Sequence, residues 1–329
     1  MRWLKNILPW LVAIGIFTYL FRQYPLGDVL MAIRHVHLFW FAVYAICYFA
    51  YIWYFDCWGL ARIFGQFGAP TQPRELFRVR FASYLIMVVN YGAGQATLAY
   101  FLQKLRHIKA AKAFSVIIFV VIMDLYWAIT LAFIGTLWSR PVVQGVALLP
   151  WVSLIWVIAN TGLITAIAFW KWQAQHKYIR WVQQHPLLQA FALASFRQYG
   201  RALLYRLPLH LAINTALFFV ALTFGVHIPF LRVLACFPIV ILAGTIPITP
   251  GGLGTIQVAT IELFQGSVSG GLLATGQIQA AELLLAMSLL IVFANYFLKA
   301  VTGSLFFHRI VRPKTDDAVS PSLPPEIPL

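Results

Sequence analysis

Three polar side chains lie at breaks in an otherwise apolar sequence or inside one of its long apolar stretches. Gln95 ends the stretch NYGAGQ at 90–95, and Gln257 follows PITPGGLG at 247–254. Asp124 lies inside the apolar stretch 113–139. A glutamine donates and accepts hydrogen bonds without carrying charge, and a carboxylate deep in an apolar segment faces a polar cavity or becomes protonated. These three residues are therefore candidates for binding a polar head group.

Each of these residues also has a structural interpretation. Asp124 could hydrogen-bond to a neighbouring helix instead of taking part in substrate or proton coupling, and each glutamine could cap the broken backbone beside it. A lone carboxylate would repel an anionic head group, so we expect Asp124 to be protonated or to bind a proton or cation that moves with the substrate. Glu262 and Glu282 fall near the outer ends of apolar segments, where an interfacial carboxylate is as reasonable as a functional one.

The glycines at the two breaks indicate backbone turns. Glycine has no Cβ, so it accepts positive φ angles and lets helices approach closely. We therefore predict turns at both breaks and include their residues among those that line the substrate site. The residues are Gly92, Gly94, Pro250, Gly251, Gly252 and Gly254.

The composition is that of a polytopic membrane protein. Hydrophobic residues make up 61% of the 329 residues, charged residues only 10%, and the mean hydropathy is +0.81. A bilayer crossing needs about 20 apolar residues. No small-residue cleavage site follows the apolar start, so we expect an uncleaved first span. The uncharged runs are 35–55, 81–103, 141–170, 207–231 and 233–261, and the shorter or interrupted candidates are 6–21, 113–139 and 278–298.

The basic residues select one topology, because cytoplasmic loops are enriched in Lys and Arg. If every segment crosses once from a cytoplasmic N-terminus, 11 basic residues lie inside and 12 outside. If 81–103 and 233–264 enter and leave by the same face, the division becomes 19 inside and 4 outside, with Lys299 uncounted. Each of these two segments is too short for two crossings and carries a break near its middle. We therefore predict two re-entrant helical hairpins.

The predicted fold is an all-α polytopic membrane protein of about six full spans and two re-entrant hairpins. The element order repeats after residue 143, which predicts a single transmembrane domain, 1–312, built from inverted halves 1–143 and 144–312. Both termini are expected in the cytoplasm. Residues 174–206 are expected to form cytoplasmic interfacial helices, and the proline-rich tail 313–329 is expected to be disordered.

Several classes of function are excluded by the same pattern. The net charge of +15 falls in short loops between spans, so it indicates membrane orientation and not nucleic-acid binding. The three cysteines have no metal-ligand spacing and are expected to pack in apolar surroundings. No catalytic constellation, metal site or cofactor motif is found, so we expect a protein that is not an enzyme and has no cofactor.

The glycine turn PITPGGLG between two apolar helices resembles the lysylphosphatidylglycerol synthase transmembrane region, a flippase-like family of integral membrane proteins. The resemblance covers nearly the whole chain. The family places a glutamate three residues after the last glycine, where this chain has Gln257. An earlier family motif is similar to YGAGQATLAY, in which Gly94 matches, Gln95 replaces an acid and the arginine is missing. Asp124 matches an acidic residue that is common in the family.

The resemblance implies translocation of a lipid or a lipid-linked substrate, with a phospholipid or polyprenyl-linked lipid as the partner. The expected location is the cytoplasmic (inner) membrane of a prokaryote. Two alternatives stay open: a membrane-embedded transferase of lipid or glycolipid synthesis, and a non-transporting subunit of a membrane complex. Association with a second copy of the chain or with a partner in a membrane complex also stays open.

Overall fold

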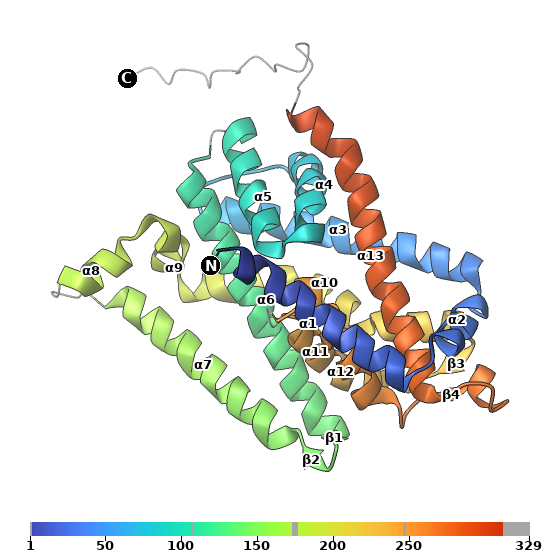
Figure 1. The fold of residues 1–329 in the computed structure, drawn as a ribbon. Helices are drawn as coiled ribbons and strands as arrows, with labels where there is room; N and C mark the ends of the chain where they lie inside the picture. The colour runs from blue at the N-terminus through green and yellow to red at the C-terminus, as the bar shows by residue number, and fades with distance from the viewer. Residues whose placement is uncertain (1, 107, 173–176, 246–247, 312–329) are drawn as a thin grey trace, which may run out of the picture.

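Helices, most of them long, make up most of the described chain (Figure 1). The structure is a computed structural model that describes residues 2–106, 108–172, 177–245 and 248–311. By length and composition, five helices in these ranges are able to cross a membrane. They are α3 (Leu38–Gln66), α6 (Ala110–Ser139), α7 (Leu149–Lys171), α10 (Phe196–Thr223) and the Ala280–Phe307 part of α13 (Ala280–Val311).

The remaining elements connect these spans. In the first half they are α1 (Arg2–Gln23), α2 (Leu26–Arg34), α4 (Pro73–Val89), α5 (Tyr91–Arg106) and the short pair β1 (Val142–Val143) and β2 (Val146–Ala147). In the second half they are α8 (Lys177–Gln183), η1 (Pro186–Leu188), α9 (Gln189–Leu193), β3 (Val226–His227), α11 (Phe230–Thr245), η2 (Pro250–Gly252), α12 (Thr255–Phe264), β4 (Ser269–Gly270) and η3 (Gly271–Leu273).

The predicted all-α membrane architecture is confirmed. Both segments predicted to turn back are helix pairs: α4 and α5 pack against each other around Asn90, and α11 and α12 pack against each other around η2. The inverted repeat, the sidedness of the termini and the domain limits stay predictions. The predicted disordered tail, 313–329, lies outside the described residues.

Helix α13 is the element on which both hairpins pack. Its C-terminal half lies along α4, and its N-terminal half lies near α12 and α2 (Figure 1). Gly303 lets α4 approach closely, because a Cβ there would lie 2.7 Å from the backbone nitrogen of Leu85. The Tyr296 hydroxyl donates to the carbonyl oxygen of Gly251 at 3.0 Å. Since α4 also contacts η2, the two hairpins meet beside the middle of α13.

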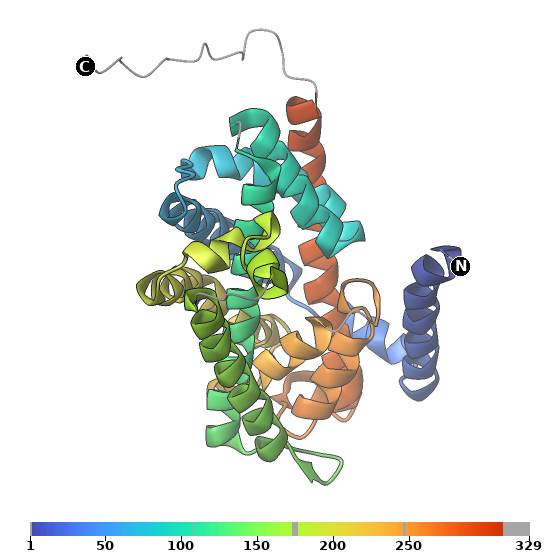
Figure 2. The same cartoon turned by 90° about the vertical axis from the view of Figure 1, so that its left-hand side faces the viewer.

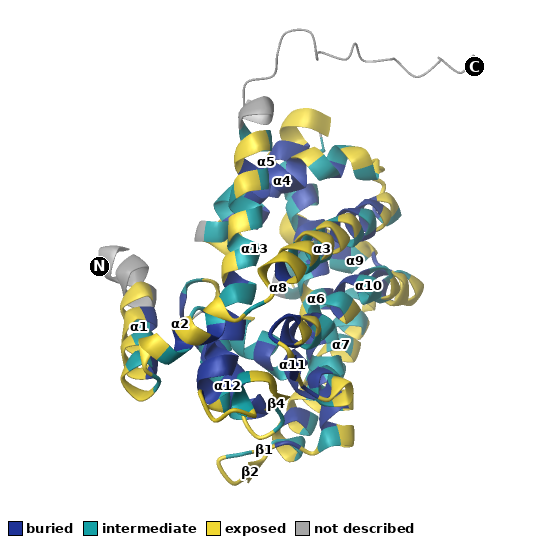
Figure 3. Ribbon diagram, turned by 90° about the vertical axis from the view of Figure 1, so that its right-hand side faces the viewer, coloured by how far each residue is buried: buried dark blue, intermediate teal, exposed yellow. Residues whose placement is uncertain are grey.

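The described residues form two large apolar cores and a small third cluster of Phe81, Tyr84 and Met87 on α4. One large core joins α3, α4, α5 and α6 with α9 and the start of α10. The other large core joins the end of α10 with α11, α12 and the start of α13. Helix α1 stands away from most of the bundle (Figure 2) and is exposed over much of its length (Figure 3). An exposed apolar surface of this kind is expected where helices face lipid.

Several predicted boundaries are wrong, and in three cases for the same reason. The span predicted to end at residue 55 continues to Gln66, and the hairpin predicted to begin at 81 begins at Pro73. The range predicted to be interfacial, 174–206, includes the first turns of the long helix α10, which starts at Phe196 and contains Arg206. Each prediction treats a charged residue as the end of an apolar run, whereas Asp56, Arg80 and Arg206 are buried inside helices.

Candidate functional site

The first hairpin turns at a single residue. Helix α4 begins with a capping box between Gln72 and Glu75 and ends at Asn90, whose backbone is extended at φ −151° and ψ 120°. The Asn90 side chain then accepts a hydrogen bond from the Ala93 backbone N–H at 2.9 Å and so caps the start of α5. Gly94 packs directly on Met87, where a Cβ would come within 2.6 Å. This close contact keeps Gln95 against α4.

A buried ion network, defined as Asp56, Arg80, Asp124 and Arg206, joins this hairpin to three spans. Asp56 on α3 accepts from Arg80 Nε at 2.6 Å through one oxygen and from Arg206 Nη1 at 2.7 Å through the other. Arg80 also donates to Gln95 Oε1 at 3.0 Å. Asp56 therefore bridges α4 and α10, and Gln95 is held at the edge of the network.

Asp124 forms the second half of the network. Its two oxygens accept from Nε and Nη2 of Arg206, each at 2.7 Å, which is the bidentate geometry that arginine favours. His210 Nε2 lies 3.1 Å from the same carboxylate. Asp124 is thus a paired carboxylate and not the lone one that the sequence suggests, while its protonation and its coupling to the substrate stay predictions. Its side chain retains 21% exposure, against 5% or less for Asp56 and Arg206.

The helices approach closely enough for these bridges because of a glycine. Gly59 lies one turn beyond Asp56 on α3, and a Cβ at this position would be 2.9 Å from the carbonyl oxygen of Tyr205 on α10. A side chain here would push α3 away from α10 and lengthen the bridge between Asp56 and Arg206. Small residues have this role in many membrane helix contacts.

A third cation lies beside the network. Lys299 on α13 places its ammonium 5.4 Å from the ring centroid of Tyr84, and the Arg80 guanidinium lies at the same distance from that ring. In the described part of the chain, no carboxylate lies within ion-pair distance of Lys299. The cluster therefore holds three cations and two carboxylates when His210 is neutral.

The second hairpin turn is built from glycines with positive φ. Gly251, Gly252 and Gly254 have φ values of 59°, 75° and 90°, and Pro250 opens the η2 turn. Gln257 Oε1 accepts from the Gly254 backbone N–H at 2.7 Å, so this glutamine caps the break. Its Nε2 is buried and has no hydrogen-bond partner among the described residues. Within those same residues, no hydrogen bond connects Gln257 to the buried ion network.

The other predicted site residues lie elsewhere. Glu282 is buried and caps the start of α13, where it accepts from the Gln279 backbone N–H at 2.6 Å. Glu262 is half-buried on α12. Gly92 is exposed in the first turn of α5, and neither Gly92 nor Gly94 has a positive φ. Positive φ therefore occurs at the glycines of the second turn, whereas in the first turn an extended asparagine makes the break and Gly94 allows the close approach to Met87.

Sequence reasoning misses Asp56, Arg80, Arg206, His210 and Lys299 as site residues. The count of basic residues places Arg80 and Arg206 in cytoplasmic loops, and the uncharged-run criterion ends a span at Asp56. A useful signal is nevertheless present, since the apolar pattern resumes at once after Asp56 with CWGLARIFG. A charged residue with apolar sequence on both sides predicts a buried partner of opposite charge.

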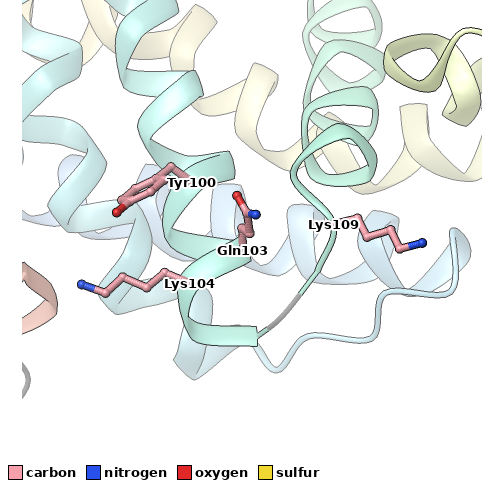
Figure 4. Close-up of a pocket in the computed structure, with 4 residues that line it drawn as sticks. All are labelled: Tyr100, Gln103, Lys104 and Lys109. Carbon is pink, nitrogen blue, oxygen red and sulfur yellow. The ribbon is translucent and has the colours of Figure 1, made fainter.

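Outside the buried ion network, the described residues show no second cluster with converging charges. A surface hollow of about 480 Å³ lies at the end of α5 beside Tyr100, Gln103, Lys104 and Lys109, and Figure 4 shows its two lysines pointing apart. In the described ranges, no group of three or more His, Cys, Asp and Glu residues is arranged to hold a metal ion.

Comparison with protein families identifies the family of this chain. The model of the family described as the lysylphosphatidylglycerol synthase transmembrane region matches residues 6–285. The chain belongs to this family. Neither a curated protein nor a solved structure matches it.

Membership in the lysylphosphatidylglycerol synthase transmembrane family indicates a membrane protein involved in lipid handling. The matched region contains both hairpin turns and all four residues of the buried ion network. It ends before Lys299, so the third cation lies on a part of α13 outside the match.

Proposed function

We propose that the protein translocates a lipid or lipid-linked substrate across the cytoplasmic membrane, with no chemical change to the substrate. The observation that supports this proposal is the position of the buried ion network. Its four charged residues are on α3, α4, α6 and α10, well inside these helices. Charged side chains at membrane depth are costly and usually mark a substrate or ion path.

The hairpins give a physical basis for this activity. Broken helices in transporters meet near the bilayer midplane and place free backbone groups beside the substrate. In this structure, α4 with its Asn90 turn contacts the η2 turn, and both pack on α13. We propose that the head group passes between these turns while the acyl chains stay in lipid. Asp124, Gln95, Gln257 and the turn residues are proposed to line that path.

Reconstitution into liposomes tests the proposal. Vesicles containing the purified protein receive a fluorescent phosphatidylglycerol, and its loss from the outer leaflet is measured by quenching with impermeant dithionite. We expect faster exchange than in protein-free vesicles and a rate that falls at least about tenfold in Asp124→Asn, which weakens the bidentate pair with Arg206.

Glu75→Gln is the matched control, because it removes a carboxylate of an exposed ion pair with Arg106 and should leave the rate unchanged. The same vesicles contain no other protein, so activity in them would also argue against a purely scaffolding role. Exchange no faster than in empty vesicles, across several lipid classes, would reject translocation.

A further inference from the structure

We propose that the C-terminal segment of this chain docks, through Asp316 and Asp317, on a basic hollow at the end of α5. The basic hollow is defined as Tyr100, Gln103, Lys104 and Lys109 and has a volume of about 480 Å³ (Figure 4). This inference is independent of the proposed function, because it concerns contact between two parts of the chain and not a substrate. It rests on the charge of the hollow, on the place where α13 ends and on the spacing of the two acids.

The basic hollow carries positive charge that its surroundings do not neutralise. Lys104 and Lys109 are exposed, and in the described part of the chain neither forms an ion pair. Glu75 is the one acidic residue in the sequence from 57 to 123, and it already pairs with Arg106 at 2.8 Å. The hollow therefore has two ammonium groups available for carboxylates from elsewhere.

The sequence supplies two carboxylates just beyond the end of α13. Asp316 and Asp317 come five and six residues after Val311, the last residue of that helix. They are two of the nine acidic residues of the chain. Lys314 lies about 7 Å before Asp316 when the segment is extended, so its charge is outside contact distance of that carboxylate.

Helix packing brings the start of this segment close to the basic hollow. Phe307 of α13 contacts Phe101 of α5 with ring centroids 6.1 Å apart. The two helices run in the same direction, because α4 packs antiparallel on both. Lys104 is about one turn beyond Phe101, and Val311 is about one turn beyond Phe307, so α13 ends level with the hollow. Five extended residues span up to about 17 Å, which is enough to pass from one packed helix to its neighbour.

The direction of the two lysine side chains matches the spacing of the two acids. Figure 4 shows Lys104 and Lys109 pointing apart. In extended backbone, successive side chains point to opposite sides. Asp316 and Asp317 can therefore pair with different lysines at the same time, whereas a single small anion would contact one of them.

Attachment to α13 favours this segment over a separate acidic partner. A single exposed ion pair is weak, because it is solvated and screened by salt. A tether of a few residues, however, holds the acids at an effective concentration of about millimolar or more. The docked segment would tie the second arm of the first hairpin to the end of α13.

Carbodiimide cross-linking tests the contact in the purified full-length protein in an uncharged detergent. The reagent joins an amine directly to a carboxylate, with no spacer, and mass spectrometry of the peptides identifies the joined residues. We expect cross-links from Lys104 and Lys109 to Asp316 and Asp317. Their yield should fall at least about threefold between low salt and about 1 M salt, because exposed charges are screened.

A double variant separates the contact from general reactivity of the basic surface. Asp316→Asn combined with Asp317→Asn keeps the size of both side chains and removes their charge. In this variant an acetylating reagent should modify Lys104 and Lys109 at least about threefold faster than in the wild type. Lys177 on α8 is exposed as well and should react at the same rate in both proteins, which makes it the internal control.

Four results would overturn the inference. Cross-links from the two acids that form equally with Lys177 would indicate contact without preference. Cross-links found only in covalent dimers would assign the basic hollow to a second copy of the chain. Protection of Lys104 and Lys109 that requires added anionic lipid and persists in the double variant would assign it to the membrane surface. Equal acetylation of these lysines in both proteins, without cross-links, would leave the hollow with no docked segment.

Discussion

Asp56 lies between two arginines, and each of its carboxylate oxygens forms an ion pair with one of them. Among the described residues, removing its charge would leave Arg80 with the Gln95 amide oxygen and the Tyr84 ring, and Arg206 with the Asp124 carboxylate and the backbone carbonyl oxygen of residue 56. Breaking a buried ion pair from one side is far more costly than the pair's net contribution, because an unpaired charge stays buried. Asp124 differs, since it is partly exposed and Arg206 would still hold Asp56.

These differences predict an order of stability. Asp56→Asn should destabilise the protein by about 3–5 kcal/mol, Asp124→Asn by less, and Glu75→Gln by less than about 1 kcal/mol because its pair with Arg106 is exposed. Thermal unfolding of the purified variants in one detergent gives the order of their Tm values. An Asp56→Asn protein as stable as Glu75→Gln would contradict the role of Asp56 as the central bridge.

Among the individual residues, the sequence alone singled out Asp124 and Gln95 as site candidates. It did not identify Arg206 and Arg80, to which their side chains are hydrogen-bonded. A burial prediction from uncharged runs treats every charge as solvated, so it places Asp56, Arg80 and Arg206 at helix ends. This assumption fails for ion pairs, because two side chains of opposite charge that contact each other can both be buried in the helix bundle. Which charges meet depends on how α3, α4, α6 and α10 pack, and no short-range pattern in the sequence encodes that packing.

At the scale of elements, the two hairpin turns use different backbone solutions. The first turns at one extended asparagine that caps the next helix. The second uses three glycines with positive φ, capped by Gln257. Sequence predicted both breaks correctly because Gly, Pro and Asn interrupt apolar runs there. It did not separate the two types of turn, since a glycine permits a positive φ without requiring it.

Alanine substitutions distinguish conformational strain from close contact. Gly254 and Gly276 both have positive φ, but only at Gly254 would a Cβ also meet Ile16 of α1, at 2.8 Å. Gly254→Ala should therefore lower the Tm more than Gly276→Ala, and Gly92→Ala should be neutral or slightly stabilising because Gly92 is helical and exposed. Equal effects at Gly254 and Gly92 would show that the second turn is ordinary helix.

At the scale of the whole molecule, the distribution of basic residues still favours one orientation. Arg80 and Arg206 belong to the buried ion network and no longer count as loop charges, which changes the division from 19 against 4 to 17 against 4. The asymmetry remains large, so the topology argument does not depend on the two misassigned arginines. The orientation of the protein in the membrane is set by the distribution of Lys and Arg between its loops. The packing of the helices carries no information about it.

Helix α6 offers a direct test of that orientation, because at 30 residues it is long enough for its two ends to lie on opposite sides of a bilayer. We expect Ala110→Cys, at its start, to be cytoplasmic and Ala147→Cys, in β2 beyond its end, to be outside. The two positions are compared in a background in which Cys47, Cys57 and Cys236 are replaced by Ala. In intact cells an impermeant maleimide should label only Ala147→Cys, and after permeabilisation it should label both. Labelling of Ala110→Cys in intact cells would reverse the assigned sidedness, and the first hairpin would then enter from the outer face.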